Sequence, residues 1–257
     1  TSKDRELINW NADNALLSVS VGRERLDKRI DIRILKDGKK AIQINKIKIK
    51  KIGELFGNFN VVMFSPEDLK IIKDSPGVRR KFIDMELCQL NPKYYYNLVQ
   101  YNKVLNERNS ILRNKNISKD ILDVYDMQLA EFGYNIIIDR LEYIKKLNKY
   151  SEKIHSDITS GKEKIEFKYT STIKDLENIK ESFYSLLEKN RARDCERGIT
   201  SIGPHRDDFV VLINDIDTKS YGSQGQQRTA VLTIKFASLK IIKELTGEHP
   251  VLLLDDV

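Results

Sequence analysis

The final seven residues of this chain, Val251-Leu252-Leu253-Leu254-Asp255-Asp256-Val257, form its most informative pattern. Four apolar residues followed by two adjacent carboxylates predict a buried strand that carries acids at its C-terminal end. A Walker B element has this form, in which one aspartate holds Mg²⁺ on nucleotide phosphates and the next acid can activate the attacking water. The alternative is a hydrophobic strand that ends in a solvated acidic turn, and the pattern alone does not separate the two.

A polar turn precedes this strand, with the sequence Tyr221-Gly222-Ser223-Gln224-Gly225-Gln226-Gln227-Arg228. It opens a predicted helix whose apolar residues have helical spacing and which ends at Gly247. Free N–H groups and a partial positive charge at a helix N-terminus suit phosphate. Gly225 allows close backbone approach, and Ser223 and Gln226 add hydrogen-bond donors. The alternative is an ordinary glycine turn in which Ser223 is only the helix N-cap.

The turn and the acidic strand together resemble a known family. Ser-Gln-Gly-Gln-Gln looks like the signature motif of ABC-type ATPases of chromosome maintenance. Together with further motifs, these segments closely resemble the RecF family of recombinational DNA-repair proteins, from about Asp4 to Val257. The further motifs are Phe64-Ser65-Pro66-Glu67-Asp68-Leu69, Ser75-Pro76-Gly77-Val78-Arg79-Arg80-Lys81-Phe82-Ile83-Asp84 and Gly203-Pro204-His205-Arg206-Asp207-Asp208-Phe209.

The sequence also departs from that family. It contains no Gly-x-x-x-x-Gly-Lys-Ser/Thr loop, which family members carry near the N-terminus, and it does not begin with Met. We therefore expect an internal fragment of a longer protein, without the N-terminal Walker A segment and the C-terminal end. The resemblance implies that the complete protein is a weak ABC-type ATPase. We expect the fragment alone to be inactive.

Composition narrows the setting and the partners. The chain has 257 residues, of which 40% are hydrophobic and 32% charged, as in ordinary soluble proteins. No apolar run approaches the ~20 residues of a membrane span, and no signal peptide is recognisable. The two cysteines, Cys88 and Cys195, lack metal-ligand spacing. We therefore expect a cytoplasmic, nucleoid-associated protein with no membrane partner.

Basic residues gather in three places that suggest an anionic partner: residues 36–51, Arg79-Arg80-Lys81, and Arg191, Arg193 and Arg197. The formal net charge is +7, and the segment 36–51 contains seven lysines and a single acid, Asp37. Such clusters can bind nucleic-acid phosphates, although each of them can equally be a solvated face. The candidate DNA-binding residues are Lys46, Lys48, Lys50, Lys51, Arg79 and Arg80.

The order of predicted elements indicates an α/β (α+β) fold. Asp37-Gly38 between two alternating runs predicts a hairpin, and Val61–Phe64 predicts a short apolar strand. Helices follow the Ser-Pro and Asn-Pro pairs, with a long helix after Ser118 and another over about 175–193. Strands return at 165–169 and 209–213. The resemblance implies an ATPase lobe with a mixed sheet, formed by 1–76 and 195–257, and an inserted mainly helical lobe at 77–194.

The resemblance also implies a mechanism with ATP and Mg²⁺ as cofactors. Two subunits would sandwich ATP head to tail, with Ser223, Gly225 and Gln226 of one contacting the nucleotide that the other holds. Asp255 would bind Mg²⁺, and Asp256 would act catalytically on the water. Many relatives have Glu at the second position, and the shorter Asp is compatible with slow hydrolysis.

The expected partners follow from the same resemblance. An ATP-dependent homodimer would bind double-stranded DNA and single-strand/double-strand junctions at gaps. It would act with RecO and RecR to help load the recombinase RecA, in DNA replication, recombination, repair and the SOS response.

Two other functions stay open at this point. One is a nuclease-linked ABC ATPase of the overcoming-lysogenisation type, against which Gly203–Phe209 argues. The other, for the fragment itself, is a DNA-binding or scaffolding module without catalysis. The roles of Glu67, His205 and Arg206 also stay open.

Overall fold

The computed structural model describes residues 3–22, 27–113 and 119–255. The chain divides into two compact units, Thr1–Asn60 and Val61–Val257. The α/β (α+β) class expected from the sequence is confirmed, since helices and strands are mixed along the chain. The division into an ATPase lobe and an inserted helical lobe stays a prediction.

The first unit contains a four-stranded antiparallel sheet in the order β1-β2-β3-β4. Ile32 of β2 pairs with Ile42 of β3 across the predicted Asp37-Gly38 turn. Gly38 adopts a φ of 82°, which a residue with a Cβ rarely adopts. The elements are η1 (Asp4–Leu7), β1 (Asn14–Val21), β2 (Lys28–Leu35), β3 (Lys40–Ile44), β4 (Ile47–Lys48) and η2 (Ile52–Leu55).

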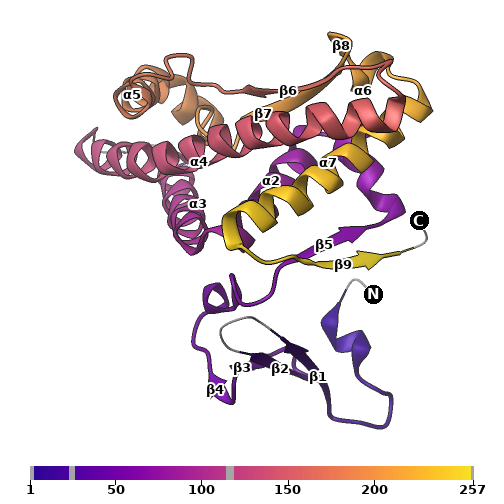
Figure 1. Cartoon of the computed structure of the whole chain (residues 1–257). Helices are drawn as coiled ribbons and strands as arrows, with labels where there is room; N and C mark the ends of the chain where they lie inside the picture. The colour runs from indigo at the N-terminus through magenta and orange to yellow at the C-terminus, as the bar shows by residue number, and fades with distance from the viewer. Residues whose placement is uncertain (1–2, 23–26, 114–118, 256–257) are drawn as a thin grey trace. The chain divides into compact units, whose positions relative to one another are not determined.

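In the second unit, strands β5 (Val61–Phe64) and β9 (Val251–Leu254) pair in parallel, although they are far apart in sequence (Figure 1). Val62 and Phe64 of β5 are buried against Ile242 of helix α7 (Gln224–Thr246). The pairing joins two strands that stand on either side of the helical block in the sequence.

The prediction that the acidic strand is buried is not met. All four side chains of β9 are exposed, from 40% for Val251 to 66% for Leu254. The reason is that β5 is the one strand that pairs with β9 within the described part of the chain. Parallel strands are normally covered on both faces, so β9 has the sequence of a buried strand in an exposed position.

Helices form most of the second unit. Pro66, Pro76 and Pro92 stand at the first positions of their helices, as the sequence predicts. The helices are η3 (Pro66–Leu69), α1 (Lys70–Lys73), α2 (Pro76–Leu90), α3 (Pro92–Leu112), α4 (Lys119–Thr159), α5 (Ile179–Arg197) and α6 (Thr218–Tyr221). The predicted N-cap of α4, Ser118, lies outside the described residues.

Helix α5 begins later than the sequence suggests, at Ile179 instead of about residue 175. The carboxylate of Asp175 accepts hydrogen bonds from the backbone N–H groups of Glu177 and Asn178. This local turn competes with helix formation, as Asp side chains often do. The helix therefore starts after the turn.

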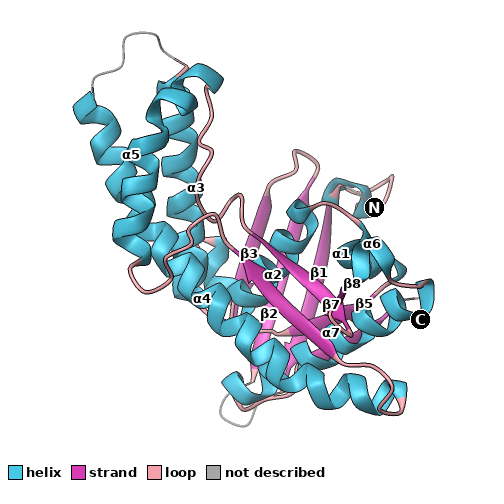
Figure 2. Cartoon of the chain, turned by 90° about the horizontal axis from the view of Figure 1, so that it is seen from above, coloured by secondary structure: helices cyan, strands magenta, loops and turns pink. Residues whose placement is uncertain are grey.

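Helix α4 is the long central helix of the second unit (Figures 1 and 2). Its 41 residues give a length of about 60 Å, and it packs against α3, α5 and α7. It also contacts the antiparallel sheet of β6 (Ile165–Thr170), β7 (Asp208–Ile213) and β8 (Ile216–Asp217). Phe209 of β7 packs against Phe167 of β6 and Phe82 of α2.

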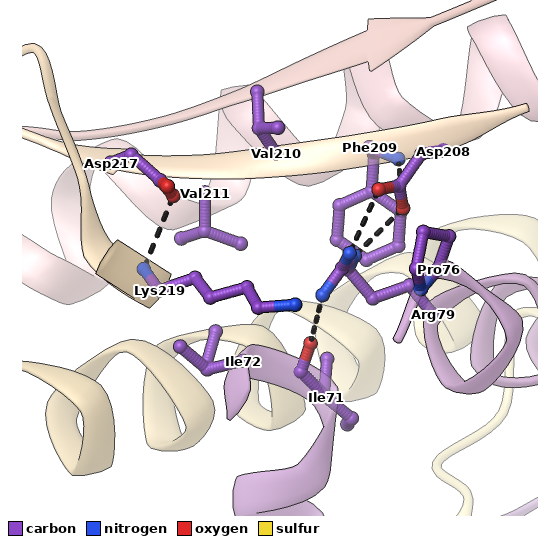
Figure 3. Close-up of a pocket in the computed structure, with 10 residues that line it drawn as sticks. All are labelled: Ile71, Ile72, Pro76, Arg79, Asp208, Phe209, Val210, Val211, Asp217 and Lys219. Carbon is purple, nitrogen blue, oxygen red and sulfur yellow. Dashed lines mark hydrogen bonds and ion pairs between the residues drawn. The ribbon is translucent and has the colours of Figure 1, made fainter. Parts of the chain in front are cut away.

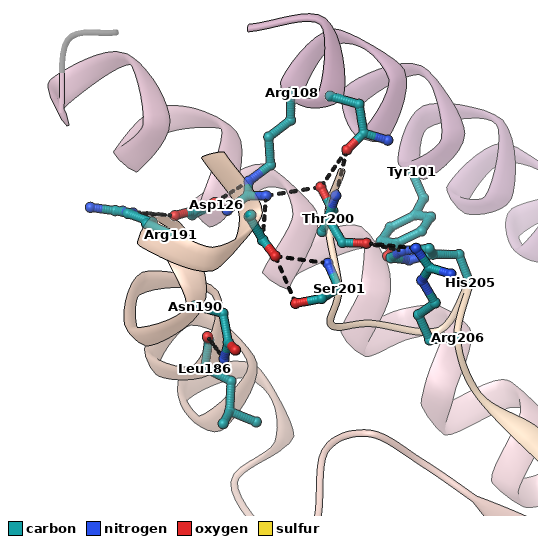
Figure 4. A network of polar contacts seen from close by, with 12 residues as sticks. Tyr101, Arg108, Asp126, Leu186, Asn190, Arg191, Thr200, Ser201, His205 and Arg206 are labelled. Atoms are coloured by element: carbon teal, nitrogen blue, oxygen red, sulfur yellow. Dashed lines mark hydrogen bonds and ion pairs between the residues drawn. The ribbon is translucent and has the colours of Figure 1, made fainter. Parts of the chain in front are cut away.

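A fully buried ion network holds three of these helices together (Figure 4). Arg108 of α3 donates to Asp126 of α4 over 2.6 Å and to Asp194 of α5 over 2.9 Å. None of the three side chains is exposed. Because a buried charge without its partner is costly, loss of one member of such a network typically costs about 3–5 kcal/mol.

Candidate functional site

The predicted signature turn forms the N-terminus of helix α7. Ser223 is the N-cap, and its hydroxyl oxygen accepts from the backbone N–H of Gln226 over 3.2 Å. The side-chain oxygen of Gln226 in turn accepts from the backbone N–H of Ser223 over 2.9 Å. This reciprocal capping box fixes both side chains that the sequence nominates for phosphate contact.

The same turn keeps hydrogen-bond donors for a ligand. The N–H groups of Gln224 and Gly225 stand in the first helical turn, where the helix offers no carbonyl acceptor. The hydroxyl of Ser223 accepts one bond and keeps its own proton to donate. Ser223, Gln224 and Gly225 are exposed. The arrangement suits an anion such as a phosphate group.

The two glycines of the turn differ in their surroundings. A Cβ at Gly222 would lie 2.5 Å from the carbonyl oxygen of Thr218, so packing inside the chain excludes a side chain there. A Cβ at Gly225 would meet only the hydroxyl oxygen of Ser223, at 3.8 Å. The surroundings of residue 225 therefore leave room for a side chain, so packing within the chain does not require glycine there.

Two residues that the sequence reasoning missed lie behind this turn. The side-chain nitrogen of Gln226 donates to Glu163 over 2.9 Å, and Glu163 lies 3.4 Å from the ring nitrogen Nε2 of His155. Glu163 stands in the turn between α4 and β6, and no local pattern links it to a residue 63 positions later.

The first carboxylate of the Walker B pattern stands where the sequence predicts. Asp255 directly follows β9, and its backbone N–H donates to the carbonyl of Phe64 over 2.9 Å. Its side chain is exposed, so its oxygens can bind a cation. A single carboxylate together with nucleotide phosphates and water suits Mg²⁺. Asp256 lies outside the described residues.

A hollow of about 370 Å³ adjoins the carboxyl end of β5. Its walls come from the Ser65–Leu69 turn on one side and from α7 on the other, where Arg228 and Leu232 line it. In the Ser65 turn, the side chain of Ser65 accepts from the backbone N–H of Glu67. Asp68 of this turn forms an ion pair with Lys235 of α7 over 2.7 Å.

Ser223 and Asp255 of one chain lie far apart. Asp255 is level with Phe64, whose ring centroid lies 5.4 Å from that of Phe236 on α7. Phe236 stands 13 residues after Ser223, which corresponds to about 20 Å along the helix axis. The start of α7 and the end of β9 are therefore two separate candidate contact points within one chain.

The candidate DNA-binding lysines lie in the first unit and are all exposed. Lys46 stands in the tight turn between β3 and β4, Lys48 ends β4, and Lys50 and Lys51 follow it. Lys46 adopts a φ of 69°, a conformation that L residues rarely take. The side chain of the preceding Asn45 fastens the turn, because it bonds to backbone groups of Arg29 and Asp27.

The two candidate arginines are engaged inside the second unit. Arg79 is 5% exposed, and two of its nitrogens donate to Asp208 over 2.7 and 2.8 Å (Figure 3). It also donates to the carbonyl oxygen of Asp74. Arg80 donates to the carbonyl oxygen of Asp207 over 2.8 Å. The burial of Arg79 removes it from the set that can reach a DNA phosphate, because its donors are already used.

His205 and Arg206 belong to the junction between the helices and β7 (Figure 4). Nε2 of His205 lies 3.0 Å from the carbonyl oxygen of Thr200, which can only accept, so Nε2 carries the proton. Nδ1 then accepts from the hydroxyl of Tyr101 over 2.7 Å. Burial lowers the pKa of His205 to about 4. Arg206 donates to the same carbonyl oxygen.

Within the described ranges, no group of three or more His, Cys, Asp or Glu side chains that could hold a metal ion occurs. Across the same ranges, no helix combines the length and apolar character that a membrane crossing requires.

Known proteins resemble this chain closely. It is 70% identical over 257 residues to the DNA replication and repair protein RecF of Clostridium perfringens (strain 13 / Type A), covering 100% of this chain and 71% of that protein. It is 68% identical, with the same coverage, to RecF of Clostridium botulinum (strain Alaska E43 / Type E3). No protein-family model matches the chain.

Solved structures agree with these relatives. A structure of the recombination mediator protein RecF with ATP superposes with a TM-score of 0.93 at 38% identity. The match covers 100% of this chain and 70% of that one. A second structure of that mediator, with ATPrS, has the same TM-score and identity and covers 71% of that chain.

Proposed function

Because the chain belongs to the RecF family of DNA replication and repair proteins, we propose that it provides two half-sites of an ATP-driven dimerisation switch. In this proposal Ser223, Gly225 and Gln226 of one copy contact ATP held by a second copy. Asp255 holds Mg²⁺, and Asp256 positions the water for slow hydrolysis. Binding of ATP closes the dimer, and hydrolysis releases it.

One observation carries the proposal. The open N-terminus of α7 and the carboxylate of Asp255 are both suited to nucleotide chemistry, yet Asp255 is level with Phe64, which packs on Phe236, 13 residues beyond Ser223 on α7. Two copies placed head to tail would bring the Ser223 of one copy to the Asp255 side of the other. The ATP bound to the RecF of a similar solved structure supports the choice of nucleotide.

The roles of the residues follow from their surroundings. The free N–H groups at the start of α7 and the hydroxyl of Ser223 would donate to phosphate oxygens, and the capping box keeps these donors fixed before the ligand arrives. When bound, Mg²⁺ supplies charge neutralisation at the phosphates. In this chain Asp255 provides the carboxylate that would hold the ion, while its backbone N–H stays in the sheet.

The switch would act on DNA. The exposed lysines at 46, 48, 50 and 51 would bind the phosphates of double-stranded DNA, including gaps and junctions, largely without regard to base sequence. A similar protein is described as a recombination mediator in the RecFOR pathway. We accordingly propose RecO and RecR as partners in loading the recombinase at gaps, and a cytoplasmic, nucleoid-associated location.

The proposal includes the two-lobe plan. Residues 1–76 and 195–257 would form the ATPase lobe, and 77–194 the inserted helical lobe. The parallel pairing of β5 with β9 supports it, because these strands come from the two separated parts of the ATPase lobe.

Substitution of Ser223 tests the switch. The protein to use is this chain extended to the full length of its relatives, called here the extended chain. Ser223→Arg places a bulky cation at the helix N-terminus and should block dimerisation with Mg-ATP, while one subunit still binds ATP. Light scattering after size exclusion measures the dimer. Ser110→Arg, on the exposed face of α3, is the control and should dimerise normally. Normal dimerisation of Ser223→Arg would remove Ser223 from the role.

Charge neutralisation tests the DNA interface. Each phosphate contact contributes about 0.9 to the slope of log affinity against log salt. Replacing Lys46, Lys48, Lys50 and Lys51 by Gln should therefore reduce that slope by about 3 to 4, measured by fluorescence anisotropy on duplex DNA. A control protein with four other exposed lysines changed should keep the slope. Those control lysines are Lys103, Lys145, Lys153 and Lys189. An equal reduction of the slope in both proteins would show that DNA binding depends only on the net charge of the protein.

A further inference from the structure

A line of polar contacts runs from the signature turn to the end of helix α4. It begins at Gln226, whose side-chain nitrogen donates to one oxygen of Glu163 over 2.9 Å. Glu163 is half-buried and follows a turn at Ser160 and Gly161, where both residues have positive φ angles of 53° and 73°. The proposed nucleotide contacts do not use Glu163.

Glu163 determines which way the amide of Gln226 points. An ionised carboxylate can only accept hydrogen bonds, so the NH₂ group of Gln226 must face it. The amide oxygen then faces the backbone N–H of Ser223, 2.9 Å away. With the amide reversed, two donors would face each other at Ser223 and the capping bond would be lost. The acid therefore selects the orientation that completes the capping box.

A buried histidine of α4 lies next to Glu163 on the side away from Gln226. The ring nitrogen Nε2 of His155, on α4, lies 3.4 Å from the second oxygen of Glu163. The other ring nitrogen of His155 lies 2.9 Å from the hydroxyl oxygen of Thr233 on α7. His155 and Thr233 are completely buried. Helix α7 is therefore contacted from this region at two places: Gln226 by Glu163, and Thr233 by His155 in the C-terminal part of α4.

We propose that Glu163 is a positioning residue of the signature turn, which holds Gln226 and Ser223 in their ligand-binding geometry and ties that geometry to the end of helix α4. The proposal rests on the proposed function, because the geometry matters only if this turn meets ATP of a second copy. Glu163 itself touches no nucleotide. A displacement of the end of α4 would reach the turn through Glu163, which follows that end by four residues.

Dimerisation of the extended chain gives the first test. Glu163→Ala removes the acceptor, and Mg-ATP-driven dimerisation should weaken at least tenfold, while ATP binding by single subunits and the melting temperature stay near those of the wild type. Glu163→Gln can still accept from the NH₂ group of Gln226 through its carbonyl oxygen, and should restore most of the dimerisation. Glu166→Ala is the control, because Glu166 pairs with Lys168 on β6 and not with Gln226. The Glu166→Ala protein should dimerise normally.

The side-chain amide of Gln226 gives the second test, independent of ATP. In protein labelled with ¹⁵N-glutamine, its NH₂ signal is identified by its loss in Gln226→Ala. The signal should shift and exchange faster with water in Glu163→Ala, but not in Glu166→Ala. An unchanged signal, or normal dimerisation of Glu163→Ala, overturns the positioning role alone. A wild-type chain that does not dimerise with Mg-ATP overturns the proposed function, and the positioning role with it.

Discussion

Gly225→Ala should make the protein more stable and the switch weaker at the same time. The new Cβ would lie 3.8 Å from the nearest atom, the hydroxyl oxygen of Ser223, which is ordinary contact. Gly225 stands in the first turn of α7 with an ordinary negative φ. Replacing a helical Gly by Ala stabilises a helix by up to about 1 kcal/mol, so the melting temperature should rise by about 2–4 °C.

The effect on dimerisation should have the opposite sign. The methyl group would project into the space where, on the proposed function, the partner's phosphate approaches. A hydrogen bond to a charged group contributes about 1.5–3 kcal/mol, so loss of one such bond weakens the dimer by about 10- to 150-fold. Light scattering of the extended chain across a Mg-ATP titration measures this, and calorimetry measures the melting temperature.

Gly222→Ala is the matched control for this prediction. Its Cβ would clash with the backbone carbonyl of Thr218 at 2.5 Å, so the melting temperature should fall. If Gly225→Ala dimerises as the wild type does, no ligand approaches this backbone closely and the reasoning is refuted. If Gly225→Ala instead melts lower, the helix start is more constrained than its surroundings indicate.

Three further predictions concern single residues. His205 has a pKa of about 4 in the fold and about 6.5 when unfolded, so its contribution is complete above pH 6.5 and is lost as the pH falls toward 4. Between pH 6.5 and 4, the unfolding free energy of the wild type should decline by about 1.4 kcal/mol per pH unit more than that of His205→Gln. Urea denaturation at several pH values measures this, and an equal decline in the two proteins would contradict it. Lys46 has a φ of 69°, which glycine adopts without strain, so Lys46→Gly should stabilise the first unit slightly. The same change should lower the salt slope of DNA binding by about 0.9. An unchanged slope would exclude a phosphate contact. Asp255→Asn should reduce the Mg²⁺ dependence of ATP binding without affecting the fold, because only the backbone of Asp255 takes part in the sheet; this is checked by calorimetric titration with and without Mg²⁺.

Local patterns in the sequence predicted most of the elements. The hairpin at Asp37-Gly38, the helix starts at the three prolines and the N-cap at Ser223 depend on residues within a few positions of one another. Backbone conformation and capping bonds are local physical effects, so they can be read without knowledge of the fold. The late start of α5 also has a local cause, the turn at Asp175, but the helix-forming sequence around it masked the signal.

Patterns of charge were less reliable, because the same residue type serves opposite purposes. Arg79 and Lys46 both belong to basic clusters, yet Arg79 is buried against Asp208 while Lys46 is exposed in a turn. The partner of Arg79 stands 129 positions away in the sequence. Burial of a charge depends on whether the fold supplies a counter-charge, and that cannot be seen in the cluster itself.

The sequence by itself determined the family, the order of helices and strands, and the signature turn and acidic strand, because these depend on short contiguous motifs. Only the tertiary structure decided that β5 lies beside β9, that Glu163 holds Gln226, and that Ser223 lies far from Asp255 in one chain. These are distances between distant segments, and they are set by the packing of α7 and α4, in which many weak apolar contacts act together. The exposure of β9 also depends on the tertiary structure. The apolar residues of a strand show that it could be buried, but not whether another part of the protein covers it.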